Sequence, residues 1–455
     1  MMDRRHFLKI ASAAGAAGSA TLFSGCTTAS AKKEAAASTM SAASVHPDAA
    51  MDIPKAKGQR TVIIGGGVSG LTIARYLRQA APDMQVVLLE RNATYQFCPL
   101  SNLYMVGGMD LNYFCRSYLD AAKNGGYLYA QSTVYDADLE NKMVYTDQGK
   151  IGYDWLVIAP GIDYNYTSIG VKDPEEEYIL RQNYPAGFMT GSEHISLKHK
   201  LENFKGGIWL NTTPAGNYRC LPAPYERTCL VADFMKKHKI KGKVIHLDAN
   251  PDITIKKKGF HAAFNELYKD YVEYIPNFDY QSVDVEKKTI SSSFDTIHFD
   301  DAAIYPRIRA SKLIEKLGIN KPGDLQFEAD IDPYTYAVKG HPDVFVTGDS
   351  RWMPYSKSAN TANSEGHFVA QVIANRAKGK DTPWISPHTI CFSMVEYEPV
   401  ESISVSAQYA YDKKKGAFEF ANVQLIEKWS KALGDGTIAW GESILGDISG
   451  NQGKA

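Results

Sequence analysis

The stretch of residues 61–90 constrains the fold of this chain more than any other. An apolar run at residues 62–64 is long enough for a buried parallel strand, and Gly65, Gly67 and Gly70 follow it directly in the pattern GxGxxG. Apolar residues at helical spacing come next, and a second apolar run ends in Glu90. The order strand, glycine turn, helix, strand and acid predicts a dinucleotide-binding βαβ unit.

Each of these residues has a distinct task in such a unit. Gly65 permits the tight turn, Gly67 lets a pyrophosphate approach the backbone, and Gly70 lets the helix pack close to the strand. The helix N-terminus offers free N–H groups to the phosphates. Glu90 is placed to accept hydrogen bonds from the adenosine ribose. The pattern alone leaves open which dinucleotide binds.

Length and charge narrow the class of protein. The 455 residues have room for two or three domains, and 44% hydrophobic with 22% charged residues is ordinary for a globular chain. A net charge of −1 gives no reason to propose nucleic acid or an acidic membrane surface as a partner. No apolar run reaches the length of a conventional transmembrane span.

The N-terminus reads as a targeting segment and not as part of the fold. Arg4 and Arg5 form a twin-arginine pattern, and a small, mildly apolar stretch follows at residues 10–23. We expect residues 1–26 to be a twin-arginine signal peptide, which exports proteins that are already folded. The expected destination is the periplasm, an oxidising compartment.

Two processing sites compete after this signal. Residues 22–26 resemble a lipobox, with Cys26 as the lipidated residue, and residues 29–31 resemble an ordinary A-x-A cleavage site. Residues 27–58 are rich in Ala and Ser and poor in apolar pattern, which is typical of a tether. The tether favours a lipid anchor at Cys26, with a soluble periplasmic form as the alternative.

Further stretches add cofactor contacts to the first unit. A buried strand at residues 155–158 ends in a small-small-Gly turn at Gly161, a common second contact with a flavin nucleotide. Another strand ends in Gly348 and Asp349, where an Asp can bind the ribityl or pyrophosphate part of FAD. Lys357 opens a helix whose N-terminus can stabilise a reduced flavin, or it is simply a solvated lysine. Two further residues complete the predicted cofactor-binding set, Val134 and Ser358.

A second α/β unit lacks the glycine pattern that a nicotinamide nucleotide requires. Its first strand at residues 207–211 is followed by a turn with one glycine, Gly216, between Pro214 and the bulky Tyr218. A pyrophosphate cannot easily approach the backbone past these side chains. We therefore predict that the protein does not use NAD(P)H.

The predicted fold class is α/β, with two Rossmann-like domains and a C-terminal α+β interface domain. The expected domains are an FAD-binding domain at residues 59–172 and 302–382, a second Rossmann-like domain at 173–301, and a C-terminal domain at 383–455.

Four motifs together resemble the flavoprotein subunit of flavocytochrome c sulfide dehydrogenase, a relative of sulfide:quinone oxidoreductases in the glutathione-reductase-like class. The likeness covers about residues 60 to 445. The motifs are Cys98-x-Leu100-Ser101-Asn102, Arg219-Cys220 with Pro224-Tyr225-Glu226-Arg227, Gly348-Asp349, and Lys357-Ser358 leading to Ala362-Asn363-Ser364.

The resemblance implies FAD bonded covalently through Cys98 to the flavin 8-methyl carbon. It also implies a redox disulfide that sulfide attacks, with Cys220 as the first cysteine. By spacing back from Gly348, the position of the second cysteine is Ala329, so we expect that cysteine to be absent. Cys229 or Cys115 could replace it, or Cys220 alone could carry a persulfide. Cys391 matches a structural position and is assigned no chemistry.

The resemblance also makes Glu226 a candidate acid/base near the flavin, although a Glu in a first helical turn also complements the helix dipole. No Cys-x-x-Cys-His occurs, so a cytochrome acceptor must be a separate c-type subunit, and no zinc-site spacing is present. The expected function is oxidation of sulfide or a related small reduced sulfur compound. A quinone-reducing enzyme and a non-catalytic electron relay, which the absence of a second cysteine would favour, are the alternatives.

Overall fold

The computed structural model describes residues 46–450. The predicted signal peptide, Cys26 and most of the predicted tether lie outside these residues. The last part of the tether is folded, which differs from the expected boundary. His46 stacks on Tyr145 with ring centroids 3.7 Å apart, Met51 is buried, and the Met51 N–H donates to the Lys150 carbonyl at 2.9 Å.

The first domain is built on a six-stranded sheet in the order β19-β20-β9-β1-β2-β5. All neighbours pair in parallel except β19 and β20. The strands are β1 (Arg60–Ile64), β2 (Gln85–Glu90), β5 (Leu128–Gln131), β9 (Trp155–Ile158), β19 (Ala337–Val338) and β20 (His341–Val346). The apolar side chains of these strands are almost fully buried, except for Trp155 and those of β5, because helices and a second sheet cover both faces.

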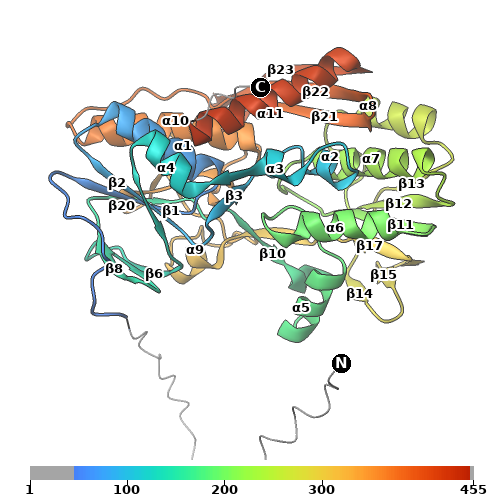
Figure 1. The fold of residues 1–455 in the computed structure, drawn as a ribbon, viewed down its shortest axis with the longest axis horizontal. Coiled ribbons are helices and arrows are strands. Elements are labelled where there is room, and N and C mark those ends of the chain that lie inside the picture. The colour runs from blue at the N-terminus through green and yellow to red at the C-terminus, as the bar shows by residue number, and fades with distance from the viewer. Residues whose placement is uncertain (1–45, 451–455) are drawn as a thin grey trace, which may run out of the picture. The chain divides into compact units, whose positions relative to one another are not determined.

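Helices and a small antiparallel sheet cover opposite faces of this sheet (Figure 1). Helices α1 (Val68–Ala80), α4 (Tyr118–Gly125) and α10 (Ala359–Arg376) lie on one side, and α1 packs along α10. The antiparallel sheet on the other side contains β6 (Val134–Asp138), β7 (Met143–Thr146) and β8 (Gly149–Gly152). Smaller elements of this domain are β3 (Thr94–Gln96), α2 (Ser101–Met105), α3 (Leu111–Phe114), β4 (Cys115–Ser117) and α9 (Lys312–Lys316).

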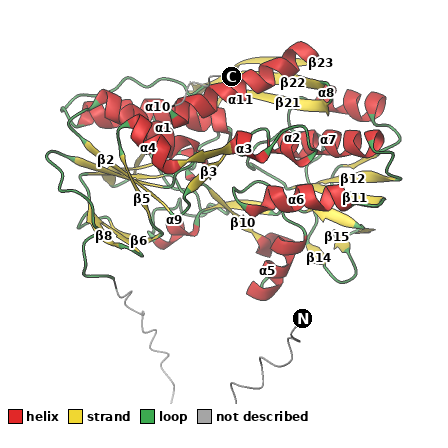
Figure 2. Ribbon diagram, viewed as in Figure 1, coloured by secondary structure: helices red, strands yellow, loops and turns green. Residues whose placement is uncertain are grey.

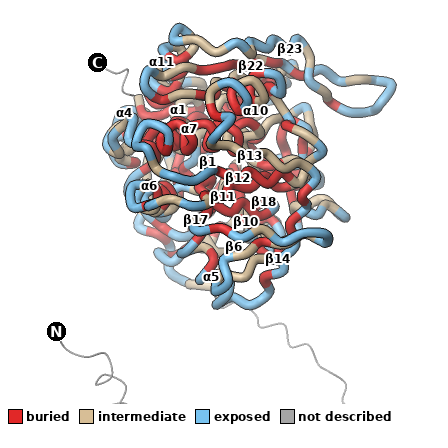
Figure 3. Tube along the Cα trace, turned by 90° about the vertical axis from the view of Figure 1, so that its right-hand side faces the viewer, coloured by how far each residue is buried: buried red, intermediate tan, exposed pale blue. Residues whose placement is uncertain are grey.

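The second domain has a parallel four-stranded sheet in the order β13-β12-β11-β17. The strands are β11 (Gly207–Thr213), β12 (Gly242–Asp248), β13 (Val272–Ile275) and β17 (Asp301–Ala303). Its helices are α5 (Pro174–Asn183), α6 (Ser192–Asn203), α7 (Ala223–Lys237) and α8 (Lys257–Ala262). A small sheet holds β14 (Ser282–Asp284), β15 (Thr289–Ser291) and β16 (Thr296–His298), and the pair β10 (Ile162–Asn165) and β18 (Arg307–Ala310) links the two domains. Figure 3 shows that the buried backbone is concentrated in the central strands and in α7 and α10.

The C-terminal segment lies across both domains (Figures 1 and 2). It consists of an antiparallel sheet, β21 (Thr389–Tyr397), β22 (Val400–Asp412) and β23 (Ala417–Ser430), followed by α11 (Lys431–Ser449). Strand β21 contacts α7 of the second domain, while α11 contacts α1 and α4 of the first. The predicted α/β class with two Rossmann-like domains is confirmed. None of the helices in residues 46–450 is long and apolar enough to cross a membrane.

Candidate functional site

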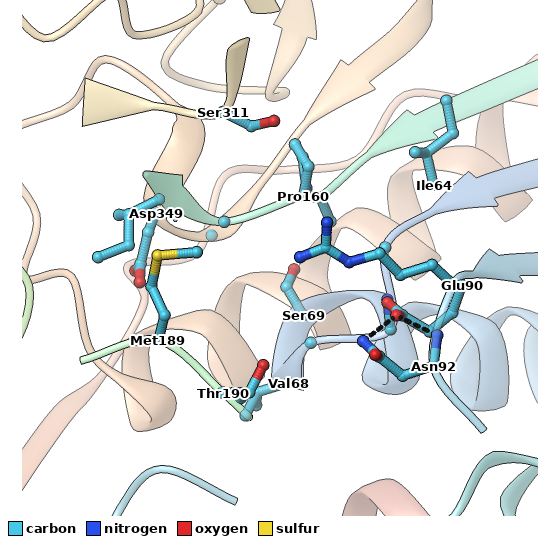
Figure 4. A pocket seen from close by; sticks show the side chains of 18 of the residues that line it. Ile64, Val68, Ser69, Glu90, Asn92, Pro160, Met189, Thr190, Ser311 and Asp349 are labelled. Atoms are coloured by element: carbon cyan, nitrogen blue, oxygen red, sulfur yellow. Dashed lines mark hydrogen bonds between the residues drawn. The ribbon is translucent and has the colours of Figure 1, made fainter. Parts of the chain in front are cut away.

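A cavity of about 530 Å³ opens at the carboxyl ends of β1, β2 and β9, in the size range of ligand pockets. Most of the residues predicted to bind a dinucleotide line it: Gly65, Gly67, Glu90, Val134, Gly161, Gly348, Asp349 and Ser358. Figure 4 shows Glu90 and Asn92 on one side of this cavity and Asp349 with Met189 on the other. Loops of the second domain add Met189, Thr190 and Arg219.

The glycine turn has the geometry that a pyrophosphate site requires. Gly65 has φ +96°, and a Cβ there would lie 2.4 Å from the Ala159 carbonyl oxygen. A Cβ at Gly70 would lie 2.0 Å from the Gly65 oxygen, so only glycine lets the helix pack this close to the turn. Gly70 itself does not line the cavity. A Cβ at Gly67 would meet nothing within 4 Å. Gly67 is the N-cap of α1 and has no side chain to cap it, so the first N–H groups of that helix are left for a ligand.

The acid at the end of β2 is held by the same turn. The Glu90 carboxylate accepts from the Gly66 N–H at 2.9 Å and from the Asn92 backbone and side-chain amides at 2.9 and 2.7 Å. These bonds fix the carboxylate at the cavity wall, where a ribose hydroxyl would reach it. The cradle, the acid and the cavity size therefore fit an FAD molecule.

Substitutions in the glycine turn are predicted to affect cofactor binding and folding differently. Gly67→Ala adds a methyl group where the phosphates would lie but clashes with nothing in the protein, so we expect normal folding with roughly ten- to hundredfold weaker FAD binding. Gly70→Ala forces backbone against backbone, so we expect the protein to fold poorly. Flavin absorbance per protein and thermal unfolding measure the two effects.

Gly152→Ala is the matched control, because its Cβ would meet only ordinary contacts at 3.8 Å. The variants are compared in a Cys98→Ser background, where no covalent link can retain the flavin, and full flavin content in folded Gly67→Ala there would contradict the assignment of this turn to the pyrophosphate.

A second, smaller cavity of about 70 Å³ adjoins the first, because Arg219, Ser358 and Ala359 line both. Three cysteines from distant parts of the chain face it: Cys98 before α2, Cys220 before α7, and Cys391 in β21. Three sulfur atoms next to a dinucleotide pocket favour redox chemistry over simple packing.

The structure corrects the expectation that Cys220 has no second sulfur beside it. Cys220 and Cys391 line the same small cavity and lie close enough for their thiols to interact electrostatically, and both are free thiols rather than a disulfide. Ala329, the expected site of the second cysteine, is fully buried and does not line this cavity. Cys391, to which the sequence assigned no chemistry, also lines this cavity, because the C-terminal strand brings its thiol to the site.

The two other proposed partners lie elsewhere. Cys229 lies on α7 within the hydrophobic core, and Cys115 lies in β4; neither lines the small cavity. Their thiols therefore do not form the pair.

The two paired thiols have different electrostatic environments. The interaction with the Cys220 thiol, opposed by burial, lowers the pKa of Cys391, and the Lys256 ammonium lowers it further. The same interaction raises the pKa of Cys220, and burial raises it further. Cys220 also adopts a left-handed backbone conformation, φ +57°, which is unusual for a residue with a side chain and is found at functional sites. Cys391 is the sulfur that more readily carries negative charge.

Glu226 lies in the wall of the small cavity, in the first turn of α7. One carboxylate oxygen accepts from the Asn102 side-chain amide at 2.8 Å and the other from the Met394 N–H at 3.1 Å. Burial raises its pKa, although Asn102 opposes that shift. A buried carboxyl with a raised pKa beside Cys220 can take up or release a proton, which fits the predicted acid/base role.

Lys357 lies where the helix N-terminus meets the cavities. Its ammonium is fully buried, 2.7 Å from a Glu328 carboxylate oxygen, and donates to the Asp349 carbonyl at 3.0 Å. Ser358 caps α10, and the Lys357 carbonyl accepts from the Cys220 N–H at 2.8 Å. Lys357 is therefore a buried, paired cation, and the alternative of a solvated lysine is wrong.

In the second domain, the features that would recognise a dinucleotide are occupied by its own side chains. Tyr218 is buried in the turn after β11, and its hydroxyl donates to the Leu221 carbonyl at 3.0 Å. Asp248, the acid at the end of β12, accepts from the Tyr225 and Tyr274 hydroxyls at 2.7 and 2.8 Å. This arrangement leaves neither an open phosphate turn nor a free ribose acceptor.

Sequence reasoning missed Cys391 and Lys256 as members of this site, and it gave Asn102 no role. Asn102 was visible in the Cys98 motif, and it links Glu226 to Arg227, whose Nε donates to the Asn102 amide oxygen at 3.0 Å. Cys391 lies in an alternating strand and Lys256 in a run of three lysines, so neither had a local signal.

Comparisons with known proteins agree with this geometry. Residues 59–184 match the family model "Pyridine nucleotide-disulphide oxidoreductase", and residues 195–306 match "Sulfide dehydrogenase [flavocytochrome c] flavoprotein chain, central". The mitochondrial sulfide:quinone oxidoreductase of Mus musculus is 24% identical over 325 residues, 69% of this chain and 70% of the relative. A type II NADH:quinone oxidoreductase of Mycobacterium tuberculosis is 26% identical, covering 72% of this chain and 75% of the relative.

Among solved structures, the sulfide:quinone oxidoreductase of Aquifex aeolicus superposes with a TM-score of 0.69 at 17% identity. The match covers 87% of this chain and 92% of that one, and it supports the fold. Together these matches confirm the relationship that the motifs indicated.

Proposed function

We propose that this chain, a FAD-dependent flavoprotein of the pyridine nucleotide-disulphide oxidoreductase-like class, oxidises sulfide or a related small reduced sulfur compound. The observation that carries the proposal is the pair of thiols, Cys220 and Cys391, in a small cavity next to the dinucleotide pocket. The matches to a sulfide dehydrogenase flavoprotein and to sulfide:quinone oxidoreductases support the choice of sulfide.

The cysteine pair can carry the reaction with balanced atoms and electrons. In the oxidised enzyme, hydrosulfide attacks one sulfur of the disulfide, forms a persulfide there and releases the other sulfur as a thiolate. A second hydrosulfide removes the outer sulfur as a disulfane anion and leaves a thiol. Disulfide formation then releases one proton and two electrons, so two hydrosulfides give one disulfane anion. FAD, when bound, would accept this electron pair.

The surrounding residues suit this chemistry. A cavity of about 70 Å³ holds a hydrosulfide or a short sulfur chain but excludes bulky thiols. Glu226 can take up the proton that is lost when a thiol becomes a thiolate or a disulfide closes. Lys357, beside Asp349 at the boundary of the cavities, supplies positive charge toward a reduced cofactor.

We propose that FAD is attached covalently through Cys98, which faces the same cavity as the redox pair. Burial raises the pKa of the Cys98 thiol, and the Arg219 guanidinium opposes that rise, which helps the thiolate to form. We expect acid-precipitated wild-type protein to stay yellow, and Cys98→Ser to release all its flavin into the supernatant. Cys115→Ser, which changes a thiol outside the cavity, is the control. Flavin that washes out of the wild type would remove the linkage.

The electron acceptor is proposed to be a separate c-type cytochrome. The matched flavocytochrome c flavoprotein chain favours it, whereas the sulfide:quinone oxidoreductase relatives keep a quinone acceptor as the second candidate. The relay alternative rested on a missing second cysteine, and Cys391 beside Cys220 in the small cavity argues against it.

We further propose that the protein is exported to the periplasm by the twin-arginine route and that Cys26 carries a lipid. The arginine pair, the lipobox-like segment and the Ala/Ser-rich stretch before residue 46 support this. We also propose that NAD(P)H is not a substrate. Tyr218 fills the turn where the pyrophosphate would bind, and the Asp248 carboxylate already accepts hydrogen bonds from two tyrosine hydroxyls.

Anaerobic mixing of purified protein with sulfide, followed by flavin absorbance, tests the function directly. We expect rapid bleaching, and reoxidation by an added c-type cytochrome rather than by a quinone analogue. NADH at the same concentration should leave the flavin oxidised. A flavin that dithionite reduces but sulfide does not would overturn the proposed activity.

A further inference from the structure

Lys256 is a buried lysine that the chemistry above does not use. Its side chain is 1% exposed, whereas the neighbouring Lys257 and Lys258 are exposed to solvent. Burying an ammonium costs free energy unless nearby groups compensate for the lost water. Its backbone is also left-handed, φ +55°, a conformation that a residue with a Cβ rarely adopts.

The contacts of Lys256 hold its charge against the backbone of Cys391. The ammonium donates to the Cys391 carbonyl at 3.1 Å and to the Ser393 hydroxyl at 2.5 Å. Lys256 belongs to the second domain, immediately before α8, while Cys391 and Ser393 belong to β21 of the C-terminal sheet. One side chain thus joins two parts of the fold at the residue that completes the thiol pair.

The other ionisable groups around Lys256 come from three elements. They are Cys220 before α7, Glu226 on α7, Cys391 on β21 and Glu427 on β23. Each of the two carboxylates already has partners, since Glu226 accepts from Asn102 and Met394, and Glu427 accepts from the Lys258 and Gly259 N–H groups at 2.8 and 3.2 Å. Neither forms a direct ion pair with Lys256 among the contacts of the described residues. The thiols, in contrast, change charge during the reaction.

We propose that Lys256 is a positioning residue that stabilises negative charge on the Cys391 sulfur and so favours the open form of the Cys220–Cys391 disulfide. This inference rests on the proposed function, in which that disulfide opens and closes. Opening takes up two electrons, and it yields one thiol and one thiolate with the uptake of one proton, or two thiols with the uptake of two protons. A fixed cation near one sulfur stabilises the thiolate, which eases reduction and makes that sulfur the more reactive one.

The test measures the reactivity of each cysteine thiol directly, without sulfide. The purified full chain is reduced with a phosphine, the phosphine is removed, and alkylation of each cysteine by iodoacetamide is followed across pH by peptide mass spectrometry. In the wild type we expect Cys391 to react as a thiolate at lower pH than Cys220. In Lys256→Met we expect alkylation of Cys391 at pH 7 to slow about tenfold, which corresponds to a rise of about one unit in its pKa.

A redox titration gives an independent readout. The Cys220–Cys391 disulfide is quantified in dithiol–disulfide buffers, and Lys256→Met should shift the equilibrium about tenfold toward the disulfide, about 30 mV lower in potential. Lys256→Arg keeps the charge and should recover most of the wild-type behaviour. Lys257→Met, an exposed neighbour, is the matched control and should behave as the wild type.

Ser393→Ala separates charge from anchoring, because it removes one hydrogen bond and leaves the ammonium in place. The proposal would be overturned if Ser393→Ala, which keeps the charge, slowed Cys391 alkylation as much as Lys256→Met does. An unchanged pH profile of alkylation in folded Lys256→Met would overturn it as well. If Lys256→Met does not fold, the alkylation profiles of the wild type serve as the test. The proposal is then overturned if Cys391 is not alkylated at lower pH than Cys220. Failure of sulfide to bleach the flavin, with these effects intact, would overturn only the proposed activity.

Discussion

Cys391→Ser is expected to lower the rate of sulfide-dependent flavin reduction by a factor of about 10³ or more. The variant removes one of the two sulfur atoms, so the disulfide that hydrosulfide attacks cannot form. Loss of a nucleophile or of its essential partner typically costs rate factors of this size, because the remaining groups cannot perform the step alone. Stopped-flow absorbance of the flavin under anaerobic conditions measures the effect.

Cys220→Ser should show the same loss, and the double variant should be no worse than either single one. Two residues that act as a unit are strongly non-additive, because removing either already abolishes the step. Cys229→Ala is the control, since this thiol lies on the same helix as Glu226 but outside the cavity.

Three further measurements distinguish a variant that has lost the sulfide reaction from one that has lost its fold. Dithionite should still reduce the flavin in Cys391→Ser, and the protein should still retain its cofactor. Peptide mapping after mild oxidation should give a Cys220–Cys391 disulfide in the wild type and none in either serine variant. Substantial sulfide turnover by Cys391→Ser would show that Cys220 works alone through a persulfide, and the pair would then lose its catalytic role.

The nucleotide-binding unit could be predicted because its signals are local. The apolar runs of β1 and β2, the glycines between them and Glu90 at the strand end lie within one stretch of the chain. Steric limits at Gly65 and Gly70 leave few alternative backbones, so the sequence pattern corresponds to one geometry. Gly161, Gly348 and Asp349 could be predicted in the same way, because they lie just after strands of the same sheet.

The second sulfur could not be found in this way, because its position depends on tertiary structure. Spacing from Gly348 indicated Ala329, which lies in a short bridge beside Arg351. Cys391 arrives instead through β21, which packs on α7 and carries its thiol back to the start of that helix. Lys256 shows the same limit, since only the packing of β21 distinguishes it from the two exposed lysines that follow it.

The largest expected effect on stability comes from the buried ion pair of Arg351 and Glu365. Their side chains are 1% and 0% exposed, and the Glu365 carboxylate accepts from Arg351 Nε and Nη2 at 2.9 and 2.6 Å. Its other oxygen accepts from the Gly348 N–H at 3.1 Å, so the pair also holds the turn that carries Asp349. Glu365→Leu is expected to lower the free energy of unfolding by about 3–5 kcal/mol, because it leaves a buried, unpaired guanidinium.

The two partners are not equivalent, because only one of them can become neutral. Arg351 stays charged at every accessible pH, whereas burial raises the pKa of Glu365 even though Arg351 opposes that rise. In Arg351→Met the opposing charge is gone, so Glu365 can take a proton and its folded-state pKa lies above the unfolded value. A raised carboxyl pKa contributes stability below the unfolded pKa and loses it as pH rises through the folded pKa. Arg351→Met should therefore be least destabilised near pH 4–5, roughly the unfolded pKa of a glutamate, and increasingly destabilised at higher pH.

Equilibrium urea unfolding followed by fluorescence at pH 5 and pH 8 tests both statements. The double variant Arg351→Met with Glu365→Leu should recover most of the loss of Glu365→Leu, since no charge remains buried. Lys415→Met is the matched control, because its pair with Glu419 is exposed, and such pairs contribute about 0–1 kcal/mol. A cost below about 1 kcal/mol for Glu365→Leu, within the range of ordinary surface pairs, would mean that water reaches this pair and that the turn at Gly348 is held by other contacts.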